Sequence, residues 1–165
     1  MKLEFRLAKY ENIEEIYSVE TRCFPIENQV KKQYYEDALK TYPEHFILLY
    51  ADDVLAGFIN AIPTNEEILL DSMLEDVSDF AKDGKNLVIV GLMVLSDYRG
   101  KGFAAKLMNE LIKMAENEKK KKIILTCLDV LVPFYKKFGY IYEGVSDSKL
   151  GGNTWYQMYL PIISE

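Results

Sequence analysis

Residues 99–102, Arg-Gly-Lys-Gly, place two cations and two glycines between a strand-like apolar run and the start of a helical pattern. The unpaired N–H groups at a helix start and the positive end of the helix dipole together form an anion site. Glycines let the backbone approach a phosphate closely, and an arginine can bond phosphate through two N–H groups. The segment matches neither the Walker loop nor the Gly-x-Gly-x-x-Gly motif. Phosphate binding is therefore the chemistry expected here, with an ordinary tight connection as the alternative.

The elements that would hold this loop follow from hydrophobic periodicity. Alternating or continuously apolar runs predict strands, whereas apolar residues spaced by three and four predict amphipathic helices. Residues 63–86 are acidic and irregular, with a short helix expected at 72–81. We expect strands at residues 2–9, 46–51, 54–62, 86–95, 123–128, 140–145 and 154–160, and helices at 10–22, 30–42, 104–115 and 130–138. This order predicts one mixed α/β domain over residues 1–165, with the Arg-Gly-Lys-Gly loop in its central crossover.

Three local patterns add detail to this outline. The alternation of apolar and charged residues over 2–9 is typical of a half-buried strand. The pair Asp52–Asp53 between two strands predicts a hairpin. The four lysines at 119–122 suit the negative end of a helix dipole, so we expect a solvated helix end there, with a contact to the 3′-phosphate of a nucleotide ligand as the alternative.

Composition and charge exclude several classes of function. The chain has 165 residues, is 49% hydrophobic and 28% charged, and carries a net charge of −6, which argues against general nucleic-acid binding. The longest apolar run, 87–95, is too short to span a bilayer, and the N-terminus does not resemble a signal peptide, so we expect a cytoplasmic protein. Cys23 and Cys127 are expected as buried thiols, and no Cys or His cluster has metal-ligand spacing, so no metal is expected.

Two segments resemble a known family. Residues 99–104, RGKGFA, fit the R/Q-x-x-G-x-G/A signature of the GNAT N-acetyltransferase superfamily, and residues 127–144, CLDVLVPFYKKFGYIYEG, resemble the matching segment of the arylalkylamine N-acetyltransferases. The resemblance implies a mixed, largely antiparallel sheet of about seven strands flanked by about four helices, with acetyl-CoA as co-substrate. It also implies acetyl transfer to the primary amine of a small molecule, arylalkylamine- or polyamine-like, by direct attack in a ternary complex.

The resemblance assigns roles to particular residues. It implies that Leu92, Met93 and Val94 pair with the pantetheine arm and that the Val94 amide donates to the oxyanion. Tyr135 holds the position of the general acid that protonates the leaving thiolate. The alternative is that Tyr135, one of 12 tyrosines, is packed in the core for its ring. The pyrophosphate cradle implied by the family pattern consists of Arg99, Gly100, Lys101, Gly102, Phe103, Ala104 and Ala105.

The general base cannot be assigned by the resemblance. The two histidines that vertebrate-type relatives carry on the central strand correspond to Val88 and Val90. Glu27 lies near the position of a glutamate in insect-type relatives and is the first candidate. The other candidates are Glu67, Asp71, His45 and a chain of waters ending on backbone carbonyls.

Alternatives to this function also stay open. The acidic segment 64–79 fits a basic peptide as well as a cationic small molecule, so acetylation of a protein N-terminus or lysine is the second enzymatic reading. A non-catalytic acyl-CoA sensor and a different phosphate ligand are the others. A homodimer could form through the final strand pair, and the loop at 146–156 is expected to border the acceptor site. Aromatic side chains that could line an acceptor slot, or belong to the core, are Phe24, Tyr34, Tyr35 and Trp155.

Overall fold

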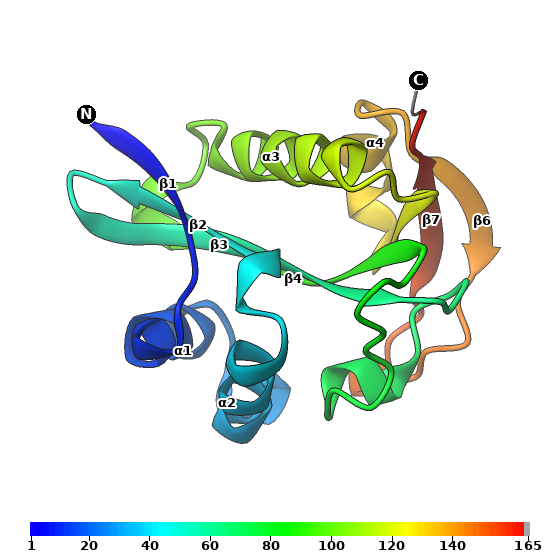
Figure 1. The fold of residues 1–165 in the computed structure, drawn as a ribbon, viewed down its shortest axis with the longest axis horizontal. Coiled ribbons are helices and arrows are strands. Elements are labelled where there is room, and N and C mark those ends of the chain that lie inside the picture. Colours follow the sequence, from blue (N-terminus) through cyan, green and yellow to red (C-terminus); the bar gives the residue numbers. More distant parts are fainter. Residues whose placement is uncertain (164–165) are drawn as a thin grey trace.

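The computed structural model describes residues 1–163. Seven strands and four α-helices follow the predicted order, joined by short 3₁₀ turns (Figure 1). The strands are β1 (Leu3–Leu7), β2 (Phe46–Ala51), β3 (Val54–Thr64), β4 (Asn86–Val94), β5 (Lys122–Cys127), β6 (Ile141–Val145) and β7 (Tyr156–Pro161). The helices are α1 (Ile13–Cys23), α2 (Lys32–Thr41), α3 (Phe103–Asn117) and α4 (Val132–Lys136). The predicted mixed α/β class is thus confirmed.

The strands form one sheet in the order β1-β2-β3-β4-β5-β7-β6. Every neighbouring pair is antiparallel except β4 and β5, which are parallel and are connected by the crossover helix α3. The β2–β3 hairpin turns at Asp52 and Asp53, whose φ angles of 48° and 67° are those that a tight hairpin turn requires. The predicted hairpin is therefore present, and the parallel pair lies at the centre of the sheet.

The two faces of the sheet bury separate cores. Figure 1 shows α1 and α2 on one side of the sheet and α3 and α4 on the other. On the α1 and α2 side, Tyr35, Phe46 and Phe58 form edge-on and stacked ring pairs with centroids 6.1–6.3 Å apart. On the other side, Leu107 and Leu111 of α3 are completely buried against the sheet. Because alternate residues of each strand serve the two faces, the apolar runs at 46–51 and 86–95 are buried on both sides.

Three local expectations are wrong. β1 lies at the edge of the sheet beside β2 alone, and four of its five residues are exposed, so the strand is less buried than expected. The acidic segment contains a single 3₁₀ turn, Asp71–Leu74, rather than a helix over 72–81. The lysine run is not a solvated helix end: α3 ends at Asn117, Lys120 is buried with its Nζ donating to the Gly84 carbonyl at 2.6 Å, and Lys122 begins β5.

Within residues 1–163, no helix has the length and apolar character needed to cross a bilayer.

Candidate active site

A gap opens in the middle of the sheet where its two parallel strands separate. β4 pairs with β5 only from Asn86 to Val88, opposite Lys122 to Ile124. Beyond Val88, the edge of β4 that faces β5 has no strand beside it in the part of the chain that the structure describes. The Leu95 N–H donates to the Ala56 carbonyl of β3, so the alternation of an antiparallel ladder directs the Val94 N–H away from β3. Backbone N–H and C=O groups are thus presented to the gap.

A β-bulge sets the direction of this part of β4. Asn60 pairs with Gly91 and Ala61 with Ile89, so Val90 is an additional residue opposite β3. A Cβ at Gly91 would lie 2.7 Å from Oδ1 of Asn60, so a larger residue would force that buried side chain to move. A bulge bends the strand that carries it, and this one precedes Leu92–Val94 directly.

The phosphate-type loop follows β4 without a gap. Gly100 and Gly102 have φ angles of 76° and 80°, in the left-handed region, and Gly102 is the N-cap residue of α3. The Tyr98 ring stacks on Phe103 with centroids 5.7 Å apart and fixes the entry to the helix. Glycine suits both positions, since an L side chain would be strained there. The result is an open helix N-terminus at the end of β4, as the sequence predicts.

Arg99 and Lys101 are both exposed beside this loop. Arg99 Nε donates to the Val94 carbonyl at 3.0 Å, which ties the loop back to the end of β4. This bond uses one of the guanidinium's five N–H donors and leaves the others able to bind an anion. Arg99 therefore both positions the strand end and supplies positive charge.

The gap contains a hollow of about 300 Å³ that brings the predicted residues together. Leu92, Met93, Val94, Arg99, Ala104 and Tyr135 all line it. The remaining residues that line it are Cys23, Phe24, Leu131 and Phe134. Phe24 is one of the aromatic candidates named above, whereas the prediction of a buried thiol is wrong for Cys23, which is only partly buried. Leu131 and Phe134 had no individual signal, although both belong to the quoted segment 127–144.

Tyr135 lies on α4 and is 9% exposed, with its ring packed edge-on against Phe134 and Tyr140 at 5.1 and 5.8 Å. Burial, reinforced by the nearby Cys127 thiol, raises the pKa of Tyr135 to about 12. The phenol is therefore protonated at neutral pH. Because Tyr135 lines the hollow, the phenol can donate a proton or a hydrogen bond to a group bound there.

The candidate bases are distributed over the molecule. Glu27 lies exposed in a 3₁₀ turn, Ile26–Asn28, three residues after Phe24, which lines the hollow. The Asp71 carboxylate is already hydrogen-bonded within the chain, because it accepts from the Ser148 hydroxyl and the Lys149 N–H. These bonds fasten the loop between β6 and β7 to the acidic segment.

His45 and Glu67 are in the wrong places to act on a group in the hollow. His45 Nε2 bonds to the Glu118 carboxylate at 2.9 Å, just beyond the far end of α3, and a helix of 15 residues is about 22 Å long. Glu67 contacts Lys122 and Lys85 at 2.6 and 2.5 Å, at the start of β5 and just before β4, and these lysines lower its pKa to about 2. Both side chains stabilise the opposite end of the sheet.

The four aromatic candidates for an acceptor slot also lie in different parts of the molecule. Tyr34 and Tyr35 are 1% and 2% exposed and belong to the core on the α1 and α2 side, so neither lines an acceptor slot. The Trp155 Nε1–H donates to the Leu150 carbonyl within its own loop at 2.8 Å. Phe24 alone of the four lines the hollow.

Comparison with known proteins bears on this geometry. Residues 13–140 match the sequence model of the acetyltransferase (GNAT) family. The chain belongs to this family. It is accordingly an acetyl-CoA-dependent acetyltransferase. The hollow, the glycines with positive φ and the open N-terminus of α3 fit the elongated, phosphate-bearing shape of that co-substrate.

Solved structures share this GNAT fold at low sequence identity. The loading GNATL domain of CurA from Lyngbya majuscula superposes with a TM-score of 0.84 at 13% identity over 98% of both chains. Arabidopsis thaliana Naa50 in complex with the bisubstrate analogue CoA-Ac-MVNAL gives 0.75 at 21% identity, covering 97% of this chain and 99% of that one. The ribosomal-protein-S18-alanine N-acetyltransferase of Escherichia coli gives 0.73 at 14%, covering 99% and 96%. No match is found among curated protein sequences.

Proposed function

We propose that this GNAT enzyme transfers the acetyl group of acetyl-CoA to the primary amine of a small molecule, by direct attack within a ternary complex. The observation that carries the proposal is the meeting of three features in one hollow: the open edge of β4, the N-terminus of α3 and the protonated phenol of Tyr135. In this arrangement the pantetheine arm pairs with Leu92–Val94. The pyrophosphate lies on the cradle of Arg99–Ala105.

In the reaction the amine nitrogen forms a bond to the thioester carbon, and the carbonyl oxygen takes up negative charge. The Val94 N–H, which points away from β3, is the proposed donor to that oxygen. The tetrahedral intermediate then loses its C–S bond, and the CoA thiolate leaves. The nitrogen must lose a proton and the sulfur must gain one or an equivalent hydrogen bond.

Tyr135 is the proposed acid for the sulfur. The pKa of the phenol, about 12, lies about three units above that of an ordinary thiol. Transfer of its proton to an ordinary thiolate would therefore cost about 4 kcal/mol. However, burial raises the pKa of the neighbouring Cys127 thiol to about 11. A CoA thiolate that loses solvation in the hollow would also have a raised pKa, which reduces this mismatch. The local environment thus supports proton transfer.

Glu27 remains the proposed base that accepts the amine proton, through water. It lies exposed in the same α1–α2 connection as Phe24, whose ring lines the hollow. Among small amines, two features favour an arylalkylamine over a polyamine as acceptor. The lining is mostly apolar, and Glu67 and Asp71 of the acidic segment already have partners within the chain.

Acetylation of a peptide N-terminus is the second candidate, favoured by a specific observation. Phe24, which lines the hollow, and Ile26, two residues further along the chain, expose 39% and 83% of their surface and could contact the side chains of an extended peptide. Of the structures that share the fold, one is a ribosomal-protein-S18-alanine N-acetyltransferase. Another, Naa50, was solved with the bisubstrate analogue CoA-Ac-MVNAL.

The test is CoA release from acetyl-CoA by the purified enzyme with tryptamine, phenethylamine, spermidine and short peptides that have a free N-terminus. Turnover that is greatest with an arylalkylamine or a polyamine supports the proposal. Turnover with peptides alone would replace it with the second candidate. Binding of acetyl-CoA without turnover on any amine would indicate a sensor instead.

A further inference from the structure

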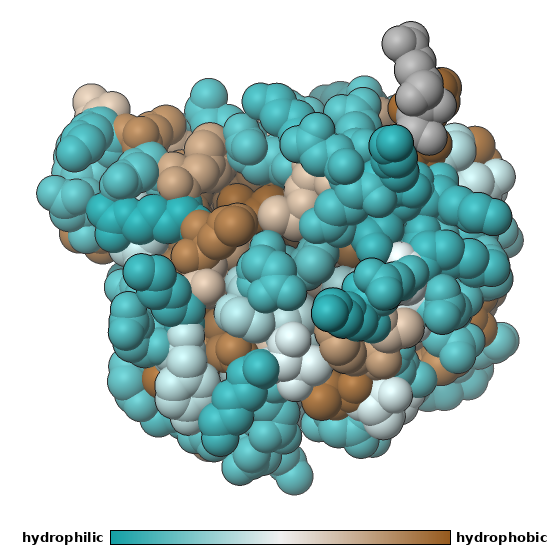
Figure 2. Space-filling model, viewed as in Figure 1, coloured by the Kyte–Doolittle hydropathy of each residue, from teal (hydrophilic) through white to brown (hydrophobic). Residues whose placement is uncertain are grey.

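Strand β1 forms an open edge of the sheet. It pairs with β2 on one side, and no strand lies on its other side within residues 1–163. Its apolar side chains Leu3, Phe5 and Leu7 are 37%, 38% and 53% exposed. Figure 2 shows hydrophobic residues gathered on this face of the molecule where β1 passes below α3. An edge strand with exposed apolar residues and unpaired backbone groups is a template for pairing with another strand.

The ladder with β2 determines which backbone groups of β1 point outward. The Lys2 carbonyl accepts from the Asp52 N–H at 2.8 Å, and the Ala8 N–H donates to the Phe46 carbonyl at 3.0 Å. In an antiparallel ladder such bonds fall on alternate residues. The even-numbered residues therefore bond to β2, and the N–H and C=O groups of Leu3, Phe5 and Leu7 point away from the sheet.

We propose that two copies of the chain associate through β1, with the two strands antiparallel about a two-fold axis at Phe5. This register places Phe5 opposite the partner's Phe5 and Leu3 opposite the partner's Leu7. Each of these odd-numbered pairs exchanges both of its backbone hydrogen bonds, since these are the residues with outward-pointing groups. The two sheets then continue into one another.

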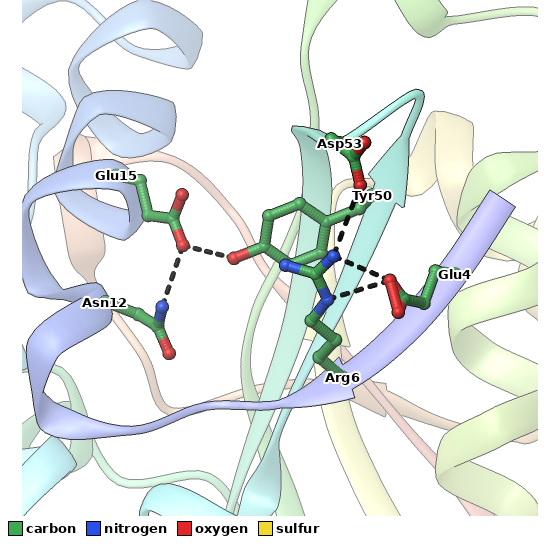
Figure 3. A network of polar contacts seen from close by, with 6 residues as sticks. All are labelled: Glu4, Arg6, Asn12, Glu15, Tyr50 and Asp53. Atoms are coloured by element: carbon green, nitrogen blue, oxygen red, sulfur yellow. Dashed lines mark hydrogen bonds and ion pairs between the residues drawn. The ribbon is translucent and has the colours of Figure 1, made fainter. Parts of the chain in front are cut away.

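The same register places opposite charges together on the other face of the strand. Glu4 lies opposite the partner's Arg6, in a pair without backbone hydrogen bonds, where opposing side chains are closest. Figure 3 shows that Glu4 and Arg6 lie on the same side of β1 and that Arg6 extends over Tyr50. The Arg6 guanidinium lies 4.1 Å from the centre of the Tyr50 ring and 2.6 Å from the Glu4 carboxylate. Within one chain Arg6 thus pairs with Glu4 and leans over β2, and in the dimer it would exchange its own Glu4 for the partner's Glu4.

The opposite edge of the sheet does not have this self-complementarity. In β6, pairing shifts between Tyr142 and Gly144, so Glu143 is a bulged residue, and Gly144 has a φ of 100°. An equivalent two-fold pairing of Ile141–Val145 would place Glu143 opposite the partner's Glu143, and like charges in that position are unfavourable. Bulges are a common protection of sheet edges against pairing. The β1 edge is thus the better candidate, although the sequence pointed to the final strand pair.

The dimer is expected to be weak and dependent on concentration, because a pair of five-residue strands buries less than the about 1,600 Å² of a standard stable interface. Sedimentation velocity over a series of protein concentrations measures the dissociation constant of the parent. The variants Glu4→Arg and Arg6→Glu each place two like-charge pairs across the axis and should weaken the dimer about tenfold or more. Far-UV circular dichroism and thermal unfolding check that both variants are folded.

The two single variants provide a matched test when they are mixed. A chain with Glu4→Arg next to a chain with Arg6→Glu has opposite charges in every even-numbered pair, so the mixture should form heterodimers that neither variant forms alone. The double variant with both changes should dimerise like the parent. A parent that is monomeric at the highest concentration overturns the proposal. Equal dimerisation of parent and single variants, or failure of the mixture to associate, overturns the interface or its register.

Discussion

Tyr135 shows how burial adjusts a single functional group. Its ring is packed between Phe134 and Tyr140, and the loss of solvation raises the pKa of the hydroxyl to about 12. The phenol therefore stays protonated throughout the pH range in which the enzyme can be assayed. Loss of the proton from Tyr135 would lower the rate only above that range. We therefore expect that titration of Tyr135 does not lower the rate of the parent enzyme up to about pH 10.

Tyr135→Phe removes the proposed acid while preserving the ring. We expect kcat to fall about tenfold or more and the dissociation constant of acetyl-CoA to change by less than about twofold, because the hydroxyl acts on the leaving sulfur. Steady-state kinetics and calorimetric titration measure the two quantities. Tyr140→Phe is the matched control, since its hydroxyl bonds to Met108 Sδ at 3.3 Å and it should leave kcat nearly unchanged. Equal losses in both variants would show a packing effect rather than an acid.

Glu20→Gln tests a buried carboxyl that is outside the hollow. Glu20 is 1% exposed, accepts a hydrogen bond from the Tyr35 hydroxyl at 2.5 Å, and has its pKa raised by burial above the ordinary value of 4.5. The folded state thus binds the proton more tightly than the unfolded state. The contribution of Glu20 to the free energy of unfolding is therefore fully present below pH 4.5, and it is lost as the pH rises through the pKa of Glu20 in the folded state.

The glutamine side chain can accept the same bond without ionising, so the variant should gain in Tm relative to the parent as the pH is raised from 5 to 8. Thermal unfolding at several pH values measures this. Glu116→Gln, at an exposed position on α3, serves as the control. A difference in Tm between variant and parent that does not change with pH would contradict the assignment.

At the scale of elements, the connection from β4 to α3 depends on backbone conformation. Gly102→Ala places a Cβ at a φ of 80°, which costs about 1 kcal/mol although nothing lies within 4 Å of that atom. We expect acetyl-CoA to bind several-fold more weakly, because relief of the strain rotates the N–H groups at the start of α3. Gly144→Ala has the same kind of strain in β6, at a φ of 100°, again with open space. It should lose similar stability without weakening acetyl-CoA binding.

Elements were predictable where periodicity was long and unambiguous. The pattern from Ala104 to Ala115 gave α3, and the apolar run at 86–95 gave β4 nearly to the residue. The exposure of β1 could not be predicted, because alternation shows which residues share a face but not how much of that face the rest of the chain covers. The lysine run was misread because the bond from Lys120 Nζ to the Gly84 carbonyl joins residues that are distant in sequence. Of the site, the loop and Tyr135 were recognisable from motifs, whereas Cys23 reaches the hollow only through the packing of α1.

At the scale of the whole molecule, stability should be greatest in the centre of the sheet. β2, β3 and β4 are buried on both faces, whereas β1 and β6 are exposed edges. Amide hydrogen exchange followed by NMR should therefore be slowest in β2–β4. At low protein concentration the outward amides of Leu3, Phe5 and Leu7 should exchange quickly. Protection of those three amides at low concentration, or rapid exchange in β3, would contradict this arrangement.

The burial of one lysine among four has a consequence for chemical labelling. Acetyl-CoA slowly acetylates exposed amines without any enzyme, and Lys119 and Lys121 are exposed. Lys120, only 8% exposed and bonded to the Gly84 carbonyl, is shielded from such a reaction while the protein is folded. The two exposed lysines, Lys119 and Lys121, thus serve as an internal reference for the acetylation of Lys120. In mass spectra of stored enzyme, acetylation of Lys120 relative to its two neighbours would report how much of the sample had unfolded.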